Sequence, residues 1–328
     1  MESDRLPAYV PCSWSDERLS LRYEIPKIWT QKSSRRFGIY WSDKLDYGRL
    51  WPDPTDAELA AFYDVPEYKD YLAGKRRTSA PYRSAFLSRL IVKIAYLADR
   101  GVNDPLPTIK HLVQRDRFSA CDIGCGSGAF LARLRAVGAV VAGVDPSPVS
   151  LAALRSTGIE SHEGTAERLP SSIEGRKFDV VTMFHSLEHC RDPSAAVASA
   201  KSIMAPNGIL VIEVPNMESI GFQTYAQCWW HTDAGRHLHF LTQRSVELLI
   251  RKQGLEPIKC EFQGFVAEFT PRWIDVMGQA WDSIFAGNSY TDKPWRPSLL
   301  RSAVYLPRAA VSRPQLKYEV VRVYARPI

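Results

Sequence analysis

The sequence predicts a three-layer α/β fold with a mostly parallel central sheet of seven strands. Short apolar runs alternate with helical stretches between residues 115 and 262, which is typical of a parallel sheet. A glycine-rich loop follows the first of these runs, and an acidic residue ends the second. The predicted strands are FSACDI (118–123), VVAGVD (140–145), FDVVTMF (178–184), ILVIEV (209–214) and PIKCEF (257–262).

The helices between these strands carry their own start and stop signals. Ser147 and Pro148 are a typical N-cap and first-turn proline, and Gly158 ends the helix that they start. The helix over residues 130–137 ends at Gly138. The start and stop signals of the helices therefore agree with the alternation of strands and helices along the chain.

Composition narrows the class of protein. The chain has 328 residues, of which 45% are hydrophobic and 24% charged, and this average balance excludes a mainly disordered or fibrous protein. No apolar run approaches the roughly 20 residues that cross a bilayer, and the start MESDRLPAYV lacks the features of a signal peptide. The six cysteines form no CxxC pair, which indicates reduced thiols. We expect a cytoplasmic protein without a transmembrane segment.

The chain divides into two predicted parts. Residues 1–83 are rich in Pro, Trp and Tyr, and we expect an irregular N-terminal cap with one short helix near Ala57 to Tyr63. Residues 84–328 form the ligand-binding domain, which begins with an amphipathic helix that we expect to form a wall of the ligand site. Within it, residues 263–316 are an insertion with a helix over PRWIDVMGQAWDSIF. The run YEVVRVYAR (318–326) predicts a last strand at the end of the sheet.

The glycine loop indicates the ligand. Gly124, Gly126 and Gly128 follow the first predicted strand and allow a tight turn that brings the backbone close to a bulky ligand at a helix N-terminus. Their GxGxG spacing differs from the GxGxxG of dinucleotide enzymes. Asp145 ends the next strand, where a carboxylate can accept both hydroxyls of a ribose. The pattern favours an adenosine-containing ligand over the alternative, a glycine-rich turn with a helix-capping Asp145.

Five successive motifs carry a family resemblance: DIGCGSGAF, GVDPS, EGTAERLP, FDVVTMFHSLEH and APNGILVIEVPN. Together they resemble the class I S-adenosylmethionine-dependent methyltransferases over about half of the chain, which implies a Rossmann-like methyltransferase fold. The LEH after the fourth strand and the later RHLHFLT are most similar to the small-molecule branch, which includes ubiquinone-pathway and sugar methyltransferases.

The resemblance implies S-adenosylmethionine as cofactor and a set of residues around it. Asp122, Gly124 and Gly126 would surround its amino acid part, and Asp145 would hold the ribose. Ala166 and Glu167 would flank the adenine, while Phe184 and His185 would lie beside the methionine portion. Thr165 stands where many relatives have an acidic residue, so backbone contacts would replace a side-chain bond to the adenine.

Five of the seven histidines follow the fourth and fifth strands, where open α/β sheets bind ligands: His185, His189, His231, His237 and His239. Methyl transfer to a hydroxyl needs a base, and a histidine is the usual one. We nominate His237 as that base, or as a structural partner of its loop, with His231 and Asp233 lining the acceptor pocket.

Other candidates stay open at this point. His189 either takes part in catalysis or fixes its helix against a loop, and Tyr63, Tyr68 and Tyr71 either cover the active site or pack as a surface helix. Cys228, His231, His237 and His239 match no closed zinc arrangement, so we predict no metal.

The predicted function is transfer of a methyl group to a small-molecule acceptor, with a hydroxyl of a sugar, phenol or lipid-linked intermediate favoured. One alternative is a nucleic-acid methyltransferase, but the chain has no adjacent prolines after the fourth strand and we expect no nucleic-acid partner. Another is a non-catalytic scaffold that only binds the cofactor. Residues 291–328 carry eight Lys and Arg against two acids, which favours an anionic acceptor, a phosphate or an acidic surface, or is a solvated basic face.

Overall fold

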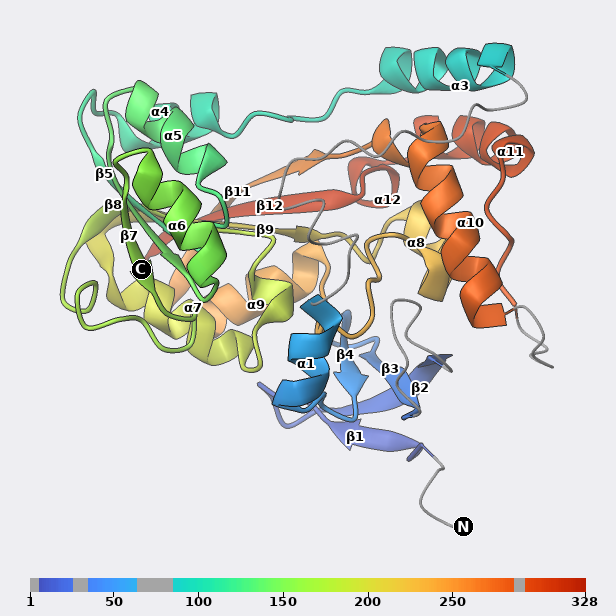
Figure 1. The fold of residues 1–328 in the computed structure, drawn as a ribbon, viewed down its shortest axis with the longest axis horizontal. Helices are drawn as coiled ribbons and strands as arrows, with labels where there is room; N and C mark the ends of the chain where they lie inside the picture. The colour runs from blue at the N-terminus through green and yellow to red at the C-terminus, as the bar shows by residue number, and fades with distance from the viewer. Residues whose placement is uncertain (1–5, 26–34, 64–84, 286–292) are drawn as a thin grey trace.

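The computed structural model describes residues 6–25, 35–63, 85–285 and 293–328. It contains a central seven-stranded sheet and a smaller five-stranded sheet beside it (Figure 1). The central sheet has the order β11-β12-β9-β8-β5-β6-β7. Its strands are β5 (Ser119–Ile123), β6 (Val140–Asp145), β7 (Glu160–Glu163), β8 (Phe178–Phe184), β9 (Met204–Pro215), β11 (Leu255–Gln263) and β12 (Val320–Pro327).

Helices cover both faces of the central sheet, which confirms the predicted three-layer α/β fold. On one face lie α4 (Leu106–Val113), α5 (Ala129–Ala136) and α6 (Pro148–Ser156), and on the other lie α7 (Pro193–Ser202) and α9 (Gln243–Lys252). Neighbouring residues of one strand pack against opposite layers of helices. Val180 packs with the first set of helices and Val181 with the second, because successive strand side chains point to opposite faces.

The predicted helix caps are present. The Ser147 hydroxyl accepts a hydrogen bond from the Ser150 amide at the start of α6. Thr242 caps α9 in the same way, in a reciprocal pair with Ser245. Each such cap stabilises a helix by about 1 kcal/mol. These local signals set where the helices begin at the ligand-binding edge of the sheet.

The prediction that the last strand pairs at the end of the sheet is wrong. β12 lies between β9 and β11 and pairs with both in antiparallel fashion. The residues of β12 from Val320 to Tyr324 are all buried, and a strand covered on both faces and both edges belongs in the interior of a sheet. β11, whose side chains are partly exposed, is the edge strand.

The N-terminal part is less irregular than predicted. It forms β1 (Tyr9–Pro11), β2 (Arg18–Ile25), β3 (Phe37–Ser42) and β4 (Tyr47–Trp51), followed by the expected helix α1 (Asp56–Tyr63). β3 is buried on both faces, so it shows no alternation of apolar and polar residues that sequence reasoning could recognise. β10 (His239–Phe240) completes this sheet, and the separate cap over residues 1–83 stays a prediction.

The insertion after β11 contains the short helix η3 (Ala267–Phe269), α10 (Pro271–Phe285), α11 (Leu299–Ala310) and α12 (Pro314–Lys317). The first helix of the predicted ligand-binding domain, α3 (Ala85–Ala98), packs on this insertion. Ile91 and Ala95 of α3 share a core with Phe269 and Tyr305. α3 is therefore on the far side of the molecule from α5 and α6, and it forms no wall of the glycine loop (Figure 1). Among the described residues, no helix has the length and hydropathy needed to span a membrane.

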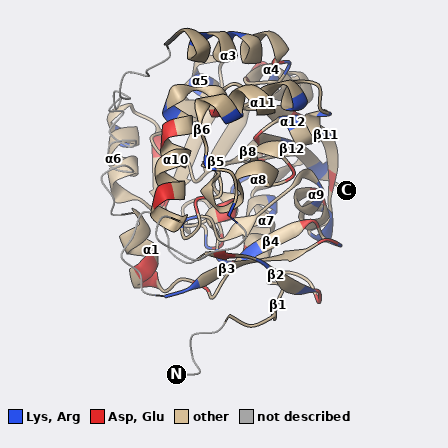
Figure 2. Cartoon of the chain, turned by 90° about the vertical axis from the view of Figure 1, so that its right-hand side faces the viewer, with Lys and Arg blue, Asp and Glu red and all other residues tan. Residues whose placement is uncertain are grey.

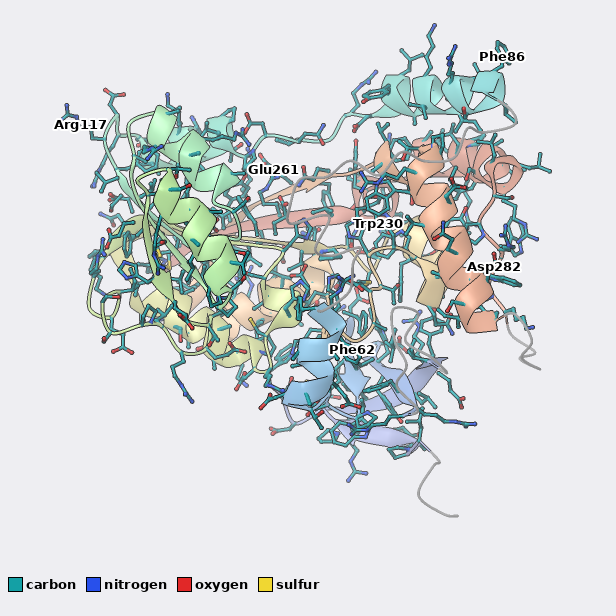
Figure 3. All side chains as sticks on the ribbon, in the orientation of Figure 1. Phe62, Phe86, Arg117, Trp230, Glu261 and Asp282 are labelled. Carbon is teal, nitrogen blue, oxygen red and sulfur yellow. The ribbon has the colours of Figure 1, made fainter. Side chains whose placement is uncertain are left out.

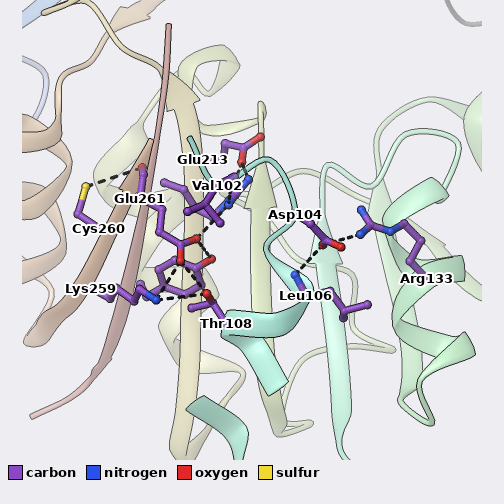
Figure 4. Close-up of polar contacts among 11 residues, drawn as sticks. Val102, Asp104, Leu106, Thr108, Arg133, Glu213, Lys259, Cys260 and Glu261 are labelled. Carbon is purple, nitrogen blue, oxygen red and sulfur yellow. Dashed lines mark hydrogen bonds and ion pairs between the residues drawn. The ribbon is translucent and has the colours of Figure 1, made fainter. Parts of the chain in front are cut away.

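A buried ion-pair network joins the three strands on the β11 side of the central sheet. Arg322 of β12 is 1% exposed, and its guanidinium contacts Glu213 of β9 at 2.5 Å and Glu261 of β11 at 3.1 Å. Glu261 also accepts hydrogen bonds from Tyr324 and Thr108, both at 2.6 Å (Figure 4). The network joins three neighbouring strands to α4.

We predict that Arg322→Met lowers the free energy of unfolding by about 3–5 kcal/mol, because two buried carboxylates lose their cation. Urea unfolding measures this change. The control is Arg115→Met, which removes a more exposed ion pair with Asp179 and should cost less than about 1 kcal/mol. Equal losses in the two variants would show that the buried network does not hold the sheet together.

Candidate active site at the carboxyl edge of the sheet

The glycine loop joins β5 to α5 at the carboxyl edge of the central sheet. Gly124, Gly126 and Gly128 all have positive φ, at 79°, 51° and 74°. A Cβ on Gly124 would lie 2.5 Å from the Cβ of Ser186, and a Cβ on Gly128 would lie 2.1 Å from Leu154. A Cβ on Gly126 would meet no atom within 4 Å. Two glycines therefore allow close packing, and the third faces open space where a ligand can approach the backbone.

Asp145 fastens this loop to the next helix. One carboxylate oxygen accepts from the Gly126 amide and the other from the Ser147 amide, both at 2.8 Å. The helix itself is capped by Ser147, so Asp145 is not its N-cap. An ionised carboxylate has about four acceptor positions, so Asp145 keeps capacity for further donors such as ribose hydroxyls.

Asp122 lies beneath the loop rather than on it. Its side chain is 3% exposed and accepts a hydrogen bond from the Thr182 hydroxyl at 2.6 Å. Burial, and to a lesser extent the charges of Asp145 and Glu213, raise its pKa to about 7. Asp122 thus couples β5 to β8 under the ligand-binding edge.

The loop after β7 holds Thr165, Ala166 and Glu167. Ala166 is buried, and the Glu167 carboxylate accepts from the Arg191 amide at 2.6 Å. This contact fastens the loop to the chain just before α7. The Glu167 side chain is therefore engaged with the protein itself, while the backbone of the loop lies at the edge of the sheet.

Phe184 and His185 leave the end of β8. The ring of Phe184 meets that of Phe130 edge to face at 4.7 Å. His185 has a φ of 50°, and its two ring nitrogens lie 3.3 Å from Glu188 and 3.3 Å from Glu213. Partial desolvation lowers the pKa of His185, but the two carboxylates outweigh it and raise the pKa to about 10. His185 is therefore a cation at neutral pH and acts as a hydrogen-bond donor.

Glu188, His189 and His237 form the group that could hold a metal ion within the described ranges: one ligand atom of each lies within 4.8 Å of the others. Nδ1 of His237 donates to the His231 carbonyl at 2.8 Å, and Nδ1 of His189 donates to the Arg236 carbonyl at 2.9 Å. These bonds leave Nε2 of each ring as an acceptor. Burial lowers the pKa of His237 to about 4, so its ring is neutral.

The set considered from the sequence does not come together as a metal site. His239 is bonded to Tyr47 at 2.6 Å through Nδ1 and to the Cys190 carbonyl at 2.8 Å through Nε2. It is part of the contact between the two sheets. Only His237 of that set belongs to the group that could bind a metal.

His231 lies between the imidazole cluster and the insertion. Its ring is parallel to that of His185 at 6.1 Å, and its Nε2 is 3.5 Å from a carboxylate oxygen of Glu319. Burial, followed by the charge of His185, holds the pKa of His231 well below the usual range. His231 is therefore a neutral imidazole beside a charged one.

Two buried acids complete this side of the site, and neither was singled out from the sequence. Glu319 directly precedes β12 and Glu268 lies in η3, with exposures of 1% and 2%. The Tyr305 hydroxyl donates to Glu268 at 2.6 Å. Burial raises the pKa of both acids, to about 7 for Glu268, and the charge of Glu268 raises that of Glu319 further.

Several polar atoms around this pair make no hydrogen bond of standard geometry with the described protein. They are both carboxylate oxygens of Glu319, Oε2 of Glu268, Nε2 of His231 and the indole nitrogens of Trp229 and Trp230. Trp230 stacks on Trp273 at 4.0 Å. The position of Glu319 at the start of the last strand was the signal that could have revealed it, since that end of β12 meets the carboxyl end of β9.

Asp233 and Tyr63 lie at the margin of the candidate site. The Asp233 carboxylate is paired with Arg236 at 2.8 Å, which orders the loop that carries His231 and His237. The Tyr63 hydroxyl of α1 is 3.1 Å from Nδ1 of His189, so the N-terminal element reaches the cluster. Tyr68 and Tyr71 lie outside the described residues.

Comparisons with known proteins agree with this geometry. A family model described as a methyltransferase domain matches residues 79–259. The chain is 28% identical over 184 residues to a ubiquinone biosynthesis O-methyltransferase of Cereibacter sphaeroides, covering 52% of this chain and 71% of that protein. It is 30% identical over 147 residues to the enzyme of the same name from Azorhizobium caulinodans, covering 41% of this chain and 57% of that protein.

The chain is also similar to solved structures at low sequence identity. One is a possible histamine N-methyltransferase from Thermotoga maritima, with a TM-score of 0.46 and 19% identity over 73% of this chain and 92% of that one. Another is a 1,6-didemethyltoxoflavin-N1-methyltransferase from Burkholderia thailandensis with bound S-adenosylhomocysteine, with a TM-score of 0.45 and 14% identity over 89% and 95% of the two chains.

The family match spans more than half of the 328 residues and includes the glycine loop, Asp145 and the His185 to His189 segment. It confirms the resemblance that the sequence motifs predicted, with S-adenosylmethionine as the cofactor. The chain belongs to the methyltransferase domain family and is a class I S-adenosylmethionine-dependent methyltransferase.

Proposed function

We propose that this protein methylates a hydroxyl oxygen of a small-molecule acceptor. The observation that carries the proposal is the pairing of a neutral, buried His231 with the charged His185 at the same edge as the glycine loop. The names of the relatives, O-methyltransferases of ubiquinone biosynthesis, support an oxygen acceptor.

The cofactor side of the proposed site is the loop with Asp145. We assign the ribose hydroxyls to the Asp145 carboxylate and the amino acid part to the region of Gly124 and Gly126, above Asp122. Ala166 and the backbone beside Glu167 would flank the adenine, and Phe184 with His185 would face the methionine portion. When bound, the cofactor would supply the methyl group from its sulfonium, and S-adenosylhomocysteine would leave as a neutral thioether.

On the acceptor side, the residues accept the proton of the acceptor hydroxyl and stabilise the negative charge that develops on its oxygen. As the oxygen forms its bond to the methyl carbon, its O–H bond breaks and the proton passes to the neutral imidazole of His231. The Glu319 carboxyl group lies 3.5 Å from Nε2 of His231, where it would stabilise the imidazolium that forms. The positive charge of His185 favours the acceptor oxygen in its anionic state.

His237 and Asp233 then have supporting roles. His237 donates to the His231 carbonyl and so orients the loop, while Asp233 holds that loop through Arg236. This assignment replaces His237 by His231 as the proposed base, because His231 is the ring that lies between the charged His185 and the buried acids.

The cofactor assignment makes a first prediction. Asp145→Asn should weaken binding of S-adenosylmethionine and S-adenosylhomocysteine about ten- to hundred-fold, because charge-assisted bonds to the ribose are lost. Isothermal titration calorimetry measures the affinity. The matched control is Glu163→Gln, since Glu163 ends the neighbouring strand in register with Asp145 and is exposed. A wild-type protein that binds neither compound would refute the cofactor site.

The base assignment makes a second prediction, tested with an acceptor found by screening phenols, sugars and lipid-linked alcohols. His231→Ala should lower kcat about 10²- to 10⁴-fold with a smaller effect on KM. Glu319→Gln should lower kcat less and change its pH profile. His111→Ala, an exposed histidine of α4, is the control. If His237→Ala abolishes turnover and His231→Ala does not, the base is His237.

The buried acid pair makes a third prediction about pH. The pKa of Glu268 is raised in the folded protein from an ordinary value near 4.5 to about 7, so stability is full below pH 4.5 and is lost as pH rises through 7. Glu268→Gln should remove much of this loss, by at most roughly 3 kcal/mol. Unfolding free energies of wild type and variant at pH 5 and pH 8 give the difference. The same pH dependence in both would contradict the raised pKa of Glu268, and Glu163→Gln again serves as control.

A further inference from the structure

We propose that α3 and α11 form a docking surface for a bilayer that contains anionic lipids. We call this surface the α3–α11 face. It consists of the outward side chains Phe86, Leu90, Ile94, Tyr96, Leu97, Leu300, Val304 and Val311 with the neighbouring basic residues Arg89, Lys93 and Arg308.

The outward sides of both helices are apolar, unlike those of ordinary surface helices. Phe86, Leu90 and Leu97 follow one face of α3 and are 81%, 42% and 66% exposed. On α11, Leu300 and Val304 are four residues apart and 71% and 63% exposed. Several large apolar side chains exposed together mark a binding surface rather than solvated protein.

The two helices present these side chains as one surface. Their inner sides are packed together, with Ile91 and Ala95 of α3 in the same core as Leu306 and Ala309 of α11. The helices lie next to each other at one end of the molecule in two views (Figures 1 and 2). Phe86 projects away from the protein at the end of α3 (Figure 3).

The positive charge of the α3–α11 face indicates which partner binds there. Neither α3 nor α11 contains Asp or Glu, while Arg89, Lys93 and Arg308 are exposed. A groove beside α3 is lined by Arg89, Lys93, Val92, Tyr96, Ser88 and Pro271, so cations border an apolar floor. Apolar side chains with interspersed Lys and Arg are the pattern of helices that lie in the interface of an anionic bilayer. A second copy would instead bring cations against cations.

The docking surface lies directly over the proposed acceptor side of the active site. Val304 points outward from α11, and its neighbour Tyr305 points inward and donates to Glu268. Resting on the proposed function, this arrangement places the docked bilayer one helix away from the acceptor side of the site. The docking itself does not depend on that function.

Co-sedimentation of the full-length protein with vesicles tests the proposal. We expect binding to vesicles of phosphatidylcholine with phosphatidylglycerol, and much weaker binding to phosphatidylcholine alone. Leu90→Ser with Leu97→Ser, and separately Leu300→Ser with Val304→Ser, should each lower the partition coefficient about ten-fold or more. Arg89→Glu with Lys93→Glu should abolish the preference for anionic vesicles.

The matched control is Val149→Ser, because Val149 is 73% exposed on α6, away from this face. It should bind vesicles like wild type, and thermal unfolding should show all variants folded. Vesicle binding equal in the patch variants and Val149→Ser would overturn the proposal. A wild-type dimer that Leu300→Ser with Val304→Ser converts to a monomer would assign the face to a second copy and overturn it too. Since vesicle binding needs neither cofactor nor turnover, failure here is distinguishable from failure of the proposed function.

Discussion

The ion pair between Arg322 and Glu213 links the interior strand β12 to the proposed chemistry at the carboxyl edge of the sheet. Arg322 occupies the interior because β12 lies between β9 and β11, and its charge is stabilised there by carboxylates from both neighbours. Glu213 places its other oxygen 3.3 Å from His185. The position of β12 inside the sheet therefore also matters for the site, because Arg322 holds one of the two carboxylates that keep His185 charged.

The histidines of this cluster differ in charge because their surroundings differ. His185 lies between two carboxylates and is a cation, while His231 and His237 are enclosed without an equally close carboxylate and stay neutral. The same principle raises the pKa of Glu268 and Glu319, which are buried together. Two residue types, His and Glu, thus provide a charged hydrogen-bond donor, neutral imidazoles and a buried acid pair of raised pKa at the same edge of the sheet.

The half of the proposed site that we assign to the cofactor was accessible to sequence reasoning, and the half that we assign to the acceptor was only partly so. Gly124, Gly126 and Asp145 are close in the chain and belong to one strand–loop–helix–strand unit, so their spacing carries the geometry. Glu268 and Glu319 are 51 positions apart, and each looks like an ordinary charged residue until β11 and β12 bring them together. The sequence predicted α3 correctly as a helix. It did not predict that α3 packs on the insertion instead of forming a wall of the ligand site.

The sequence by itself determined the α/β class, most of the central strands, the helix caps, the cofactor loop and the family, because these depend on local periodicity and on residues near one another in the chain. Only the tertiary structure decided the interior position of β12, the five-stranded N-terminal sheet and the charge state of each histidine. The physical reason is that strand order and pKa depend on neighbours that the fold supplies from distant parts of the chain, and local patterns do not encode those neighbours.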